Sequence, residues 1–270
     1  MSAGRTVRIV SLGILLAIFV VGLLAGSITQ VSYAMQFREL PNSPPTAGHI
    51  LGTDSLGRDL FARVIYGSRV SLLLAPAAAL VCALIAGVLG SLAGLAGGWT
   101  ERVILALADL YLSLPLLFVL LALRALLPLD VSPALSVFAT FALLGGLGWP
   151  ASLRVVWATA RTLRDSDLLL LARATGARRW RIVLLHIIPN LRPVMFAQFC
   201  ISIPMFILME ATLSMLGLGV MEPMPSWGNL LRGLEDFSAV AANPWRLAPL
   251  ALLVTVVICF QLILVQEELA

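Results

Sequence analysis

Long runs of apolar residues, separated by short polar segments, fill most of this chain. A helix needs about 20 apolar residues to cross the ~30 Å hydrocarbon core of a bilayer. Charged residues make up 12% of the chain, about half the share found in an ordinary soluble domain. We therefore expect an all-α integral membrane protein. Its transmembrane helices, about six in number, are expected over Ile9–Ile28, Val70–Gly98, Val103–Leu127, Val131–Val156, Pro193–Leu218 and Leu247–Val265.

Arginine is concentrated in one loop, residues 158–192, between the fourth and fifth apolar runs. Loops rich in basic residues stay on the cytoplasmic side of a membrane. We therefore expect this loop and both termini to be cytoplasmic, and segments 30–69 and 219–246 to be outside. Membrane topology accounts for the net charge of +4, so the expected partner is membrane lipid and not nucleic acid. The arginines of the loop are Arg161, Arg164, Arg173, Arg178, Arg179, Arg181 and Arg192.

Three parts follow from this pattern: a tail with the first helix (1–29), an extracytoplasmic loop (30–69) and a core of five helices (70–270). The loop carries an apolar face and a charged face at helical spacing, which predicts an amphipathic helix lying on the outer membrane surface. The alternative is a solvated loop with a helix that is capped by Thr53 or Asp54. The apolar face consists of Leu56, Leu60 and Val64, and the charged face of Arg58, Asp59 and Arg63.

Small residues recur at every fourth position in the second run. This spacing lets two helix backbones approach closely in lipid, so we expect a packing seam there. The second to sixth runs each contain a proline, which removes a backbone hydrogen bond and predicts a kinked helix. The small residues are Ala86, Gly90, Gly94 and Gly98, and the prolines are Pro76, Pro115, Pro150, Pro204 and Pro249.

Several classes of protein are excluded by missing residue types. All 18 basic residues are arginine, so the chain lacks the lysine that a P-loop ATPase places on the phosphates. The two histidines, His49 and His186, are expected on opposite sides of the membrane, which argues against a metal site that joins them and against an intramembrane hydrolase. The cysteines lie in apolar runs without metal-ligand spacing, so we predict no metal site. They are Cys82, Cys200 and Cys259.

Two acids, Asp109 and Glu210, lie within the apolar runs, where burial of a carboxylate is costly and therefore points to a function. For Glu210 we weigh a contact with the translocated molecule against a hydrogen bond or ion pair with Arg58, Arg69 or another outer residue that holds a gate closed. For Asp109 the expected partner is a backbone group freed by Pro115. The candidate path or gate set is Glu210, Asp109, Ser214 and Met209.

Four separated motifs resemble the permease subunits of ATP-binding-cassette importers, in the C-type branch of the dipeptide, oligopeptide and nickel group. The motifs are Gly52–Asp59 with Tyr66–Leu72; Asp109 with Leu114 and Pro115; Ala172–Ala177 with His186–Asn190; and Ile207–Gly219 with Pro225–Asn229. The sequence departs from the family pattern at Leu170, where the family often has Glu, and in its last ten residues, which lack the family's Gly-Asp and Asp-Pro pairs.

This resemblance implies the type I permease fold with a cytoplasmic coupling helix in the plasma membrane of a bacterium or archaeon. It implies a second, homologous permease subunit, two ATPase subunits and an extracytoplasmic binding protein as partners. ATP and Mg²⁺ would be bound by the ATPases, and no cofactor or catalysis is expected in this chain. The residues implied to contact an ATPase are Leu171, Ala172, Arg173, Ala174, Thr175, Gly176, Ala177, Arg178 and Arg179.

The cargo implied by the resemblance is a di- or oligopeptide. Nickel or a nickel chelate is the alternative, because methionines gather in the outer half and thioether sulfur is a soft ligand. A proton-coupled secondary transporter is a more distant alternative, since such proteins are expected to show more intramembrane acids and an internal repeat. The methionines are Met205, Met209, Met215, Met221 and Met224.

Overall fold

The structure is a computed structural model that describes residues 2–29, 31–126, 132–167, 169, 171 and 179–268. Helices make up most of these residues, and the only β pairing among them is three isolated bridges. The expected all-α class is confirmed. The helices are α1 Ser2–Leu23, α2 Ala25–Ile28, α3 Leu60–Ala96, α4 Gly98–Ser113, α5 Leu116–Ala125, α6 Pro133–Leu147, α7 Trp149–Arg164, α9 Arg179–Ile182, the π-helical η1 Val183–Ile187, α10 Ile188–Met215, α11 Trp227–Leu231, η2 Arg232–Leu234, α12 Phe237–Ala242, η3 Pro244–Leu247 and α13 Ala248–Glu268.

Five helical segments within the described ranges are long and apolar enough to cross a membrane, and α4 with α5 makes a sixth if this bent pair is one span. The two helices of the pair meet at an angle of 79°. The break lies at Leu114, which has extended backbone angles (φ −98°, ψ 127°). Proline at 115 disfavours the helical conformation of the residue before it. The third expected run therefore consists of two helices with a sharp bend between them, in agreement with the kink that Pro115 predicts.

Helix α3 begins at Leu60 and continues without interruption to Ala96. The separate surface helix expected between Leu56 and Arg69 is therefore wrong as a distinct element. Leu56 lies in the turns before the helix, and Leu60 and Val64 lie in its first turns. The amphipathic pattern was real, but no break in the chain follows it, so the segment extends the adjoining span.

The chain divides into two compact units. The first consists of Met1–Ala75, Leu123–Phe141 and Pro204–Ala270, and the second of Pro76–Ala122 and Ala142–Ile203. Within α3 and α10 the division falls at prolines 76 and 204, which interrupt the ladder of backbone hydrogen bonds. The boundaries of these two units do not coincide with those of the three parts that the apolar pattern suggested.

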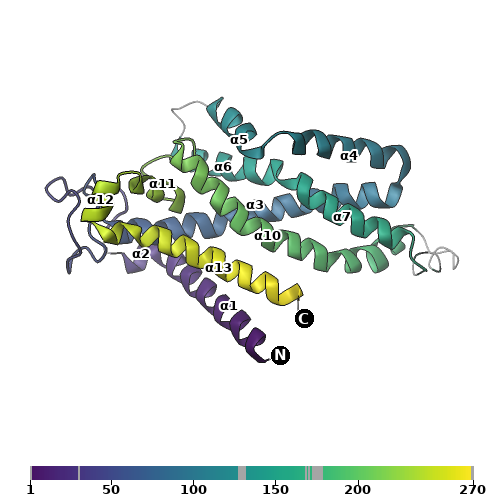
Figure 1. Cartoon of the computed structure of the whole chain (residues 1–270), viewed down its shortest axis with the longest axis horizontal. Helices are drawn as coiled ribbons and strands as arrows, with labels where there is room; N and C mark the ends of the chain where they lie inside the picture. Colours follow the sequence, from purple (N-terminus) through teal and green to yellow (C-terminus); the bar gives the residue numbers. More distant parts are fainter. Residues whose placement is uncertain are drawn as a thin grey trace. The chain divides into compact units, whose positions relative to one another are not determined.

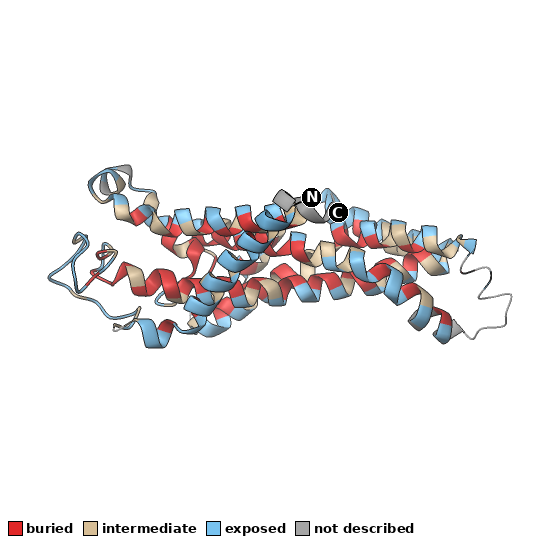
Figure 2. Ribbon diagram, turned by 90° about the horizontal axis from the view of Figure 1, so that it is seen from below, coloured by how far each residue is buried: buried red, intermediate tan, exposed pale blue. Residues whose placement is uncertain are grey.

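In the first unit, α1 packs along α13, and the start of α1 and the end of α13 lie close together (Figure 1). Both helices also expose large apolar side chains, such as Ile9, Leu16 and Ile258. Figure 2 shows that exposed residues recur beside buried ones along the helices. Apolar exposure of this kind suits helices that contact lipid.

In the second unit, α3 packs closely against α7. A Cβ atom added at Gly90 would lie 2.9 Å from the carbonyl oxygen of Leu153, and one added at Gly94 would lie 2.7 Å from the Cβ atom of Ala160. Ala86 is fully buried in the same region. The expected seam of small residues is confirmed for these three positions, whereas Gly98 begins α4 and a Cβ atom added there would meet no atom within 4 Å.

Candidate functional site

Glu210 is fully buried near the end of α10 and accepts two hydrogen bonds from serine hydroxyls. Ser214 Oγ donates to Glu210 Oε1 over 2.6 Å, and Ser226 Oγ donates to the same oxygen over 2.7 Å. Ser214 lies one turn further along α10, whereas Ser226 precedes α11. The carboxylate therefore joins the segment between α10 and α11 to α10.

Ser226 occupies the N-cap of α11. Its hydroxyl accepts a hydrogen bond from the backbone N–H of Asn229, and the Asn229 side chain accepts one from the backbone N–H of Ser226. This reciprocal capping box fixes the start of a helix. It orients the Ser226 hydroxyl so that the same group both caps α11 and reaches Glu210.

Trp227 places α11 against the first part of α3. The side chain is fully buried, its Nε1 donates to Ser68 Oγ over 3.2 Å, and its backbone N–H lies 3.4 Å from Ser71 Oγ. The adjacent Gly228 lies directly on α10, since an added Cβ atom would come within 2.5 Å of Ala211 Cα. Only a residue without a side chain fits this approach.

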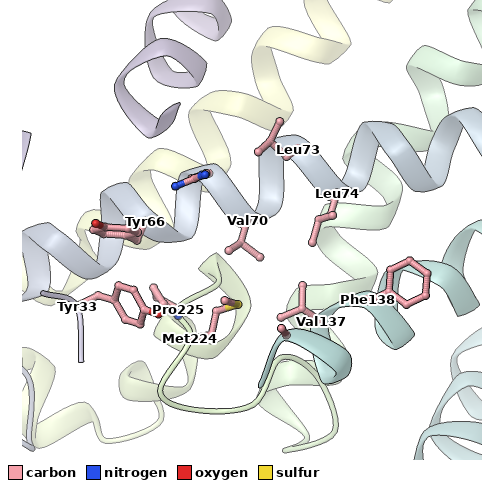
Figure 3. A pocket seen from close by; sticks show the side chains of 11 residues that line it. Tyr33, Tyr66, Val70, Leu73, Leu74, Val137, Phe138, Met224 and Pro225 are labelled. Atoms are coloured by element: carbon pink, nitrogen blue, oxygen red, sulfur yellow. The ribbon is translucent and has the colours of Figure 1, made fainter. Parts of the chain in front are cut away.

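A cavity of about 410 Å³ opens beside this junction (Figure 3). Its walls come from the first part of α3, from α6 and from the segment that precedes α11. The rings of Tyr33 and Tyr66 lie 4.8 Å apart at one end, and Arg69 is the charged member of a lining that is otherwise mostly apolar. The described residues that line it are Tyr33, Tyr66, Arg69, Val70, Leu73, Leu74, Ala134, Val137, Phe138, Met224 and Pro225.

The charged residues that precede and begin α3 are buried and paired. Arg58, Asp59 and Arg63 are 8%, 4% and 1% exposed, so the charged face expected on the outer surface is wrong. The guanidinium of Arg58 contacts Asp54 and Glu222, and that of Arg63 also contacts Glu222. His49 Nδ1 lies 2.7 Å from a carboxylate oxygen of Asp59.

In the second unit, the acid expected to bond a freed backbone group has a different partner. Asp109 on α4 forms an ion pair with Arg154 on α7, and both side chains are about half exposed. One turn further along α7, Trp157 Nε1 donates to Oε1 of Glu101 on α4 over 2.9 Å. These pairs hold α4 against α7 beside a small apolar cluster.

Comparison with known proteins gives the family. Residues 86–266 match the family described as the inner membrane component of binding-protein-dependent transport systems. The chain belongs to this family. It is therefore a multi-pass inner-membrane transport component, and the resemblance to C-type permease subunits is confirmed.

Curated relatives of this permease cover most of its length. The oligopeptide transport system permease protein OppC of Bacillus subtilis is 31% identical over 238 residues, or 88% of this chain and 75% of that protein. The dipeptide transport system permease protein DppC of the same species is 32% identical over 87% of this chain and 71% of that protein. The glutathione transport system permease protein GsiD of Pectobacterium atrosepticum is 33% identical over 80% of this chain and 69% of that protein.

The structure brings together two members of the expected path or gate set. Glu210 and Ser214 share a hydrogen bond, and Met209 lies beside them on α10 with a half-buried side chain. Asp109 belongs to the other unit. The hydrogen-bonding partners of Glu210 are serines of the permease, while Arg58 is engaged with Asp54 and Glu222.

The expected ATPase contact falls mostly outside the described residues. Ala172, Arg173, Ala174, Thr175, Gly176, Ala177 and Arg178 all lie there. Leu171 is described and is 66% exposed, and Arg179 is the first residue of α9. The role of these residues stays a prediction.

Sequence reasoning missed Arg124, the one basic residue of α5. Its Nε donates to the carbonyl oxygen of Leu218 over 2.9 Å and its Nη2 to that of Gly219 over 3.0 Å, and it also contacts the hydroxyl of Ser136. The signal was present, because a lone arginine in an apolar run requires a partner. This guanidinium fixes the chain where it leaves α10.

Proposed function

We propose that this permease imports di- or oligopeptides as one translocation subunit of an ATP-driven importer. The observation that carries the proposal is the cargo of the named relatives, which are oligopeptide, dipeptide and glutathione permeases. Nickel is not favoured, because each of these three relatives is named for a peptide and none is named for the metal. The outer methionines then act as apolar gap-fillers.

The partners that we propose are a homologous permease subunit, two ATPases that bind ATP and Mg²⁺, and an extracytoplasmic binding protein. The chain itself performs no chemical catalysis. Its arginine-rich loop and both termini face the cytoplasm, and Leu171 to Arg179 transmit the movement of an ATPase. The positive charge of that loop supports this orientation. Residues 30–69 and 219–246 then lie on the outer side.

We assign Glu210 a gating role in this scheme. Its carboxylate joins α10 to the segment before α11 through Ser226, and Trp227 joins that segment to α3. These bonds would hold the outer segment closed until the importer opens outward. The neighbouring cavity with Tyr33, Tyr66 and Arg69 offers apolar walls and one cation, which suits a peptide side chain and a carboxylate.

Uptake by cells tests the cargo. Cells that lack this chain, and the same cells with the chain restored, are given a labelled dipeptide and radioactive nickel in parallel. Restoration should raise dipeptide uptake and leave nickel uptake unchanged. A rise in nickel uptake alone would replace the peptide assignment with the metal.

A matched pair of charge reversals tests the ATPase contact. Arg173→Glu should abolish dipeptide uptake at an unchanged level of permease, because Arg173 lies in the proposed contact. Arg5→Glu makes the same charge change in the N-terminal tail on the same proposed side of the membrane, and it should retain uptake. Equal losses in both variants would remove the special role of the loop.

A further inference from the structure

A second cavity, of about 390 Å³, lies among the outer segments of the first unit. Four arginines and two acids line it, so its ionised side chains carry a net charge of +2. A cavity that is walled by protein concentrates such a field and attracts anions. The charged residues are Asp54, Arg58, Arg63, Glu222, Arg232 and Arg246.

Arg63 is the central feature of this cavity. Its side chain is only 1% exposed, and its Nη2 donates to the two carboxylate oxygens of Glu222 over 2.8 and 3.0 Å. Its Nε and Nη1 have no hydrogen-bond partner among the described residues, and the nearest acid to Nε is Asp54 at 3.7 Å. Buried N–H groups without an acceptor are costly, so an added acceptor for Nε or Nη1 would stabilise this guanidinium.

The other arginines divide into two groups. Arg58 uses the same acids as Arg63, since its Nε and Nη1 lie 2.7 Å from Asp54 Oδ2 and Glu222 Oε2. Arg246 is buried and donates to the amide oxygen of Asn42 over 2.9 Å, and Arg232 is exposed. In the part of the chain that the structure describes, neither of these two pairs with a carboxylate. The excess positive charge therefore belongs to Arg232 and Arg246.

We propose that this cavity is a binding site for a carboxylate group, with Nη1 of Arg63 as its main donor and Arg232 at its mouth. Glu222 shows that the arginines of this cavity can bind a carboxylate, because its own carboxylate already bridges Arg58 and Arg63. Guanidinium and carboxylate groups form short, charge-assisted hydrogen bonds. One added carboxylate lowers the net charge of the site to +1, and it supplies the acceptor that Arg63 lacks.

Thermal unfolding of the purified importer complex tests this site with a matched pair of probes. N-acetyl-alanine carries a free carboxylate, and N-acetyl-alanine amide has nearly the same shape without the charge. Neither has the free amine of a transported peptide, so the test is separate from that of the cargo. At saturation the acid should raise the midpoint temperature by about 2 °C, and the amide should leave it unchanged.

Variants locate the effect within the cavity. Arg63→Met should remove the shift, and Glu222→Gln should enlarge it, because it deletes a competing negative charge. Arg232→Gln, which is exposed and expected to fold, should raise the half-maximal concentration of the acid about tenfold. Arg38→Gln makes the same charge change at an exposed outer position away from the cavity and should have no effect. Equal shifts by acid and amide, or equal effects of the variants at 232 and 38, would overturn the proposal.

Discussion

The hydroxyl of Ser226 donates a hydrogen bond of 2.7 Å to Oε1 of Glu210. This bond links the cap of the short helix α11 to a fully buried acid on the membrane-spanning helix α10. Because Ser226 also caps α11 and the next residue, Trp227, packs on α3, one small segment ties α10 to α3. Disruption of this link should therefore loosen the packing of α11 against α3 and α10.

A double-mutant cycle measures the link. Glu210→Ala removes the acceptor of two buried hydroxyls, and such a loss costs about 1–3 kcal/mol. Ser226→Ala should cost about 1 kcal/mol, partly through the cap, and the double variant should cost less than the sum of the two. Thermal unfolding of the assembled complex gives the three values. Strictly additive effects would mean that the two residues do not interact.

Glutamine at 210 separates a gate from a structural support. Glu210→Gln keeps an acceptor oxygen for the serines, so the complex should assemble at a normal level. Under the gating account, dipeptide uptake should change while assembly does not. Loss of assembled complex in this conservative variant would assign Glu210 a structural role alone.

Gly228→Ala tests how closely α11 lies on α10. The added methyl group would meet Ala211 Cα at 2.5 Å and Ser214 Cβ at 2.9 Å, and overpacking of this kind typically costs about 1–3 kcal/mol. Gly146→Ala is the control, because no heavy atom lies within 4 Å of a Cβ atom at that helical glycine. The first variant should lower the unfolding temperature, and the second should leave it unchanged or raise it slightly.

Arg124→Lys tests whether the guanidinium holds the end of α10. Lysine keeps the positive charge, but its single ammonium group cannot reproduce the two-pronged contact with the carbonyl oxygens of Leu218 and Gly219. We expect a loss of about 1–3 kcal/mol in stability. Arg102→Lys, at an exposed position on α4, is the matched control. Equal stability of both variants would show that charge alone suffices at 124.

The pair Asp109–Arg154 tests the membrane position of α4 and α7. A lone charge within the bilayer costs about 2.5–3.5 kcal/mol on insertion scales, so Asp109→Asn or Arg154→Gln alone should lower the amount of inserted permease. The double variant, which removes both charges, should recover most of it. Normal insertion of both single variants would place the pair in water, where such bridges contribute little.

The sequence alone was enough to predict which segments form long apolar helices, because bilayer thickness imposes a length that apolar runs must meet. It also contained the break at Leu114, since proline restricts the residue before it. It did not show that α3 continues through Arg63, because the amphipathic pattern of residues 56–64 is compatible with a surface helix as well as with the first turns of a span.

The partners of the buried charges were the least predictable part of the site. Arg63 pairs with Glu222, which lies 159 residues further along the chain, and Ser226 reaches Glu210 through a turn whose geometry depends on its own capping. No local periodicity encodes such pairings. Sequence motifs named Glu210 and Ser214 as candidates, but only the fold shows that the two side chains meet and that Ser226 joins them.

Reconstitution into proteoliposomes tests the central claim most directly. The assembled importer, its binding protein and a labelled dipeptide are combined with ATP on the side of the ATPases, with and without this chain. The account predicts dipeptide uptake that requires both ATP and this permease and that persists when the proton gradient is collapsed. Uptake that continues without ATP and stops when the proton gradient is collapsed would contradict it.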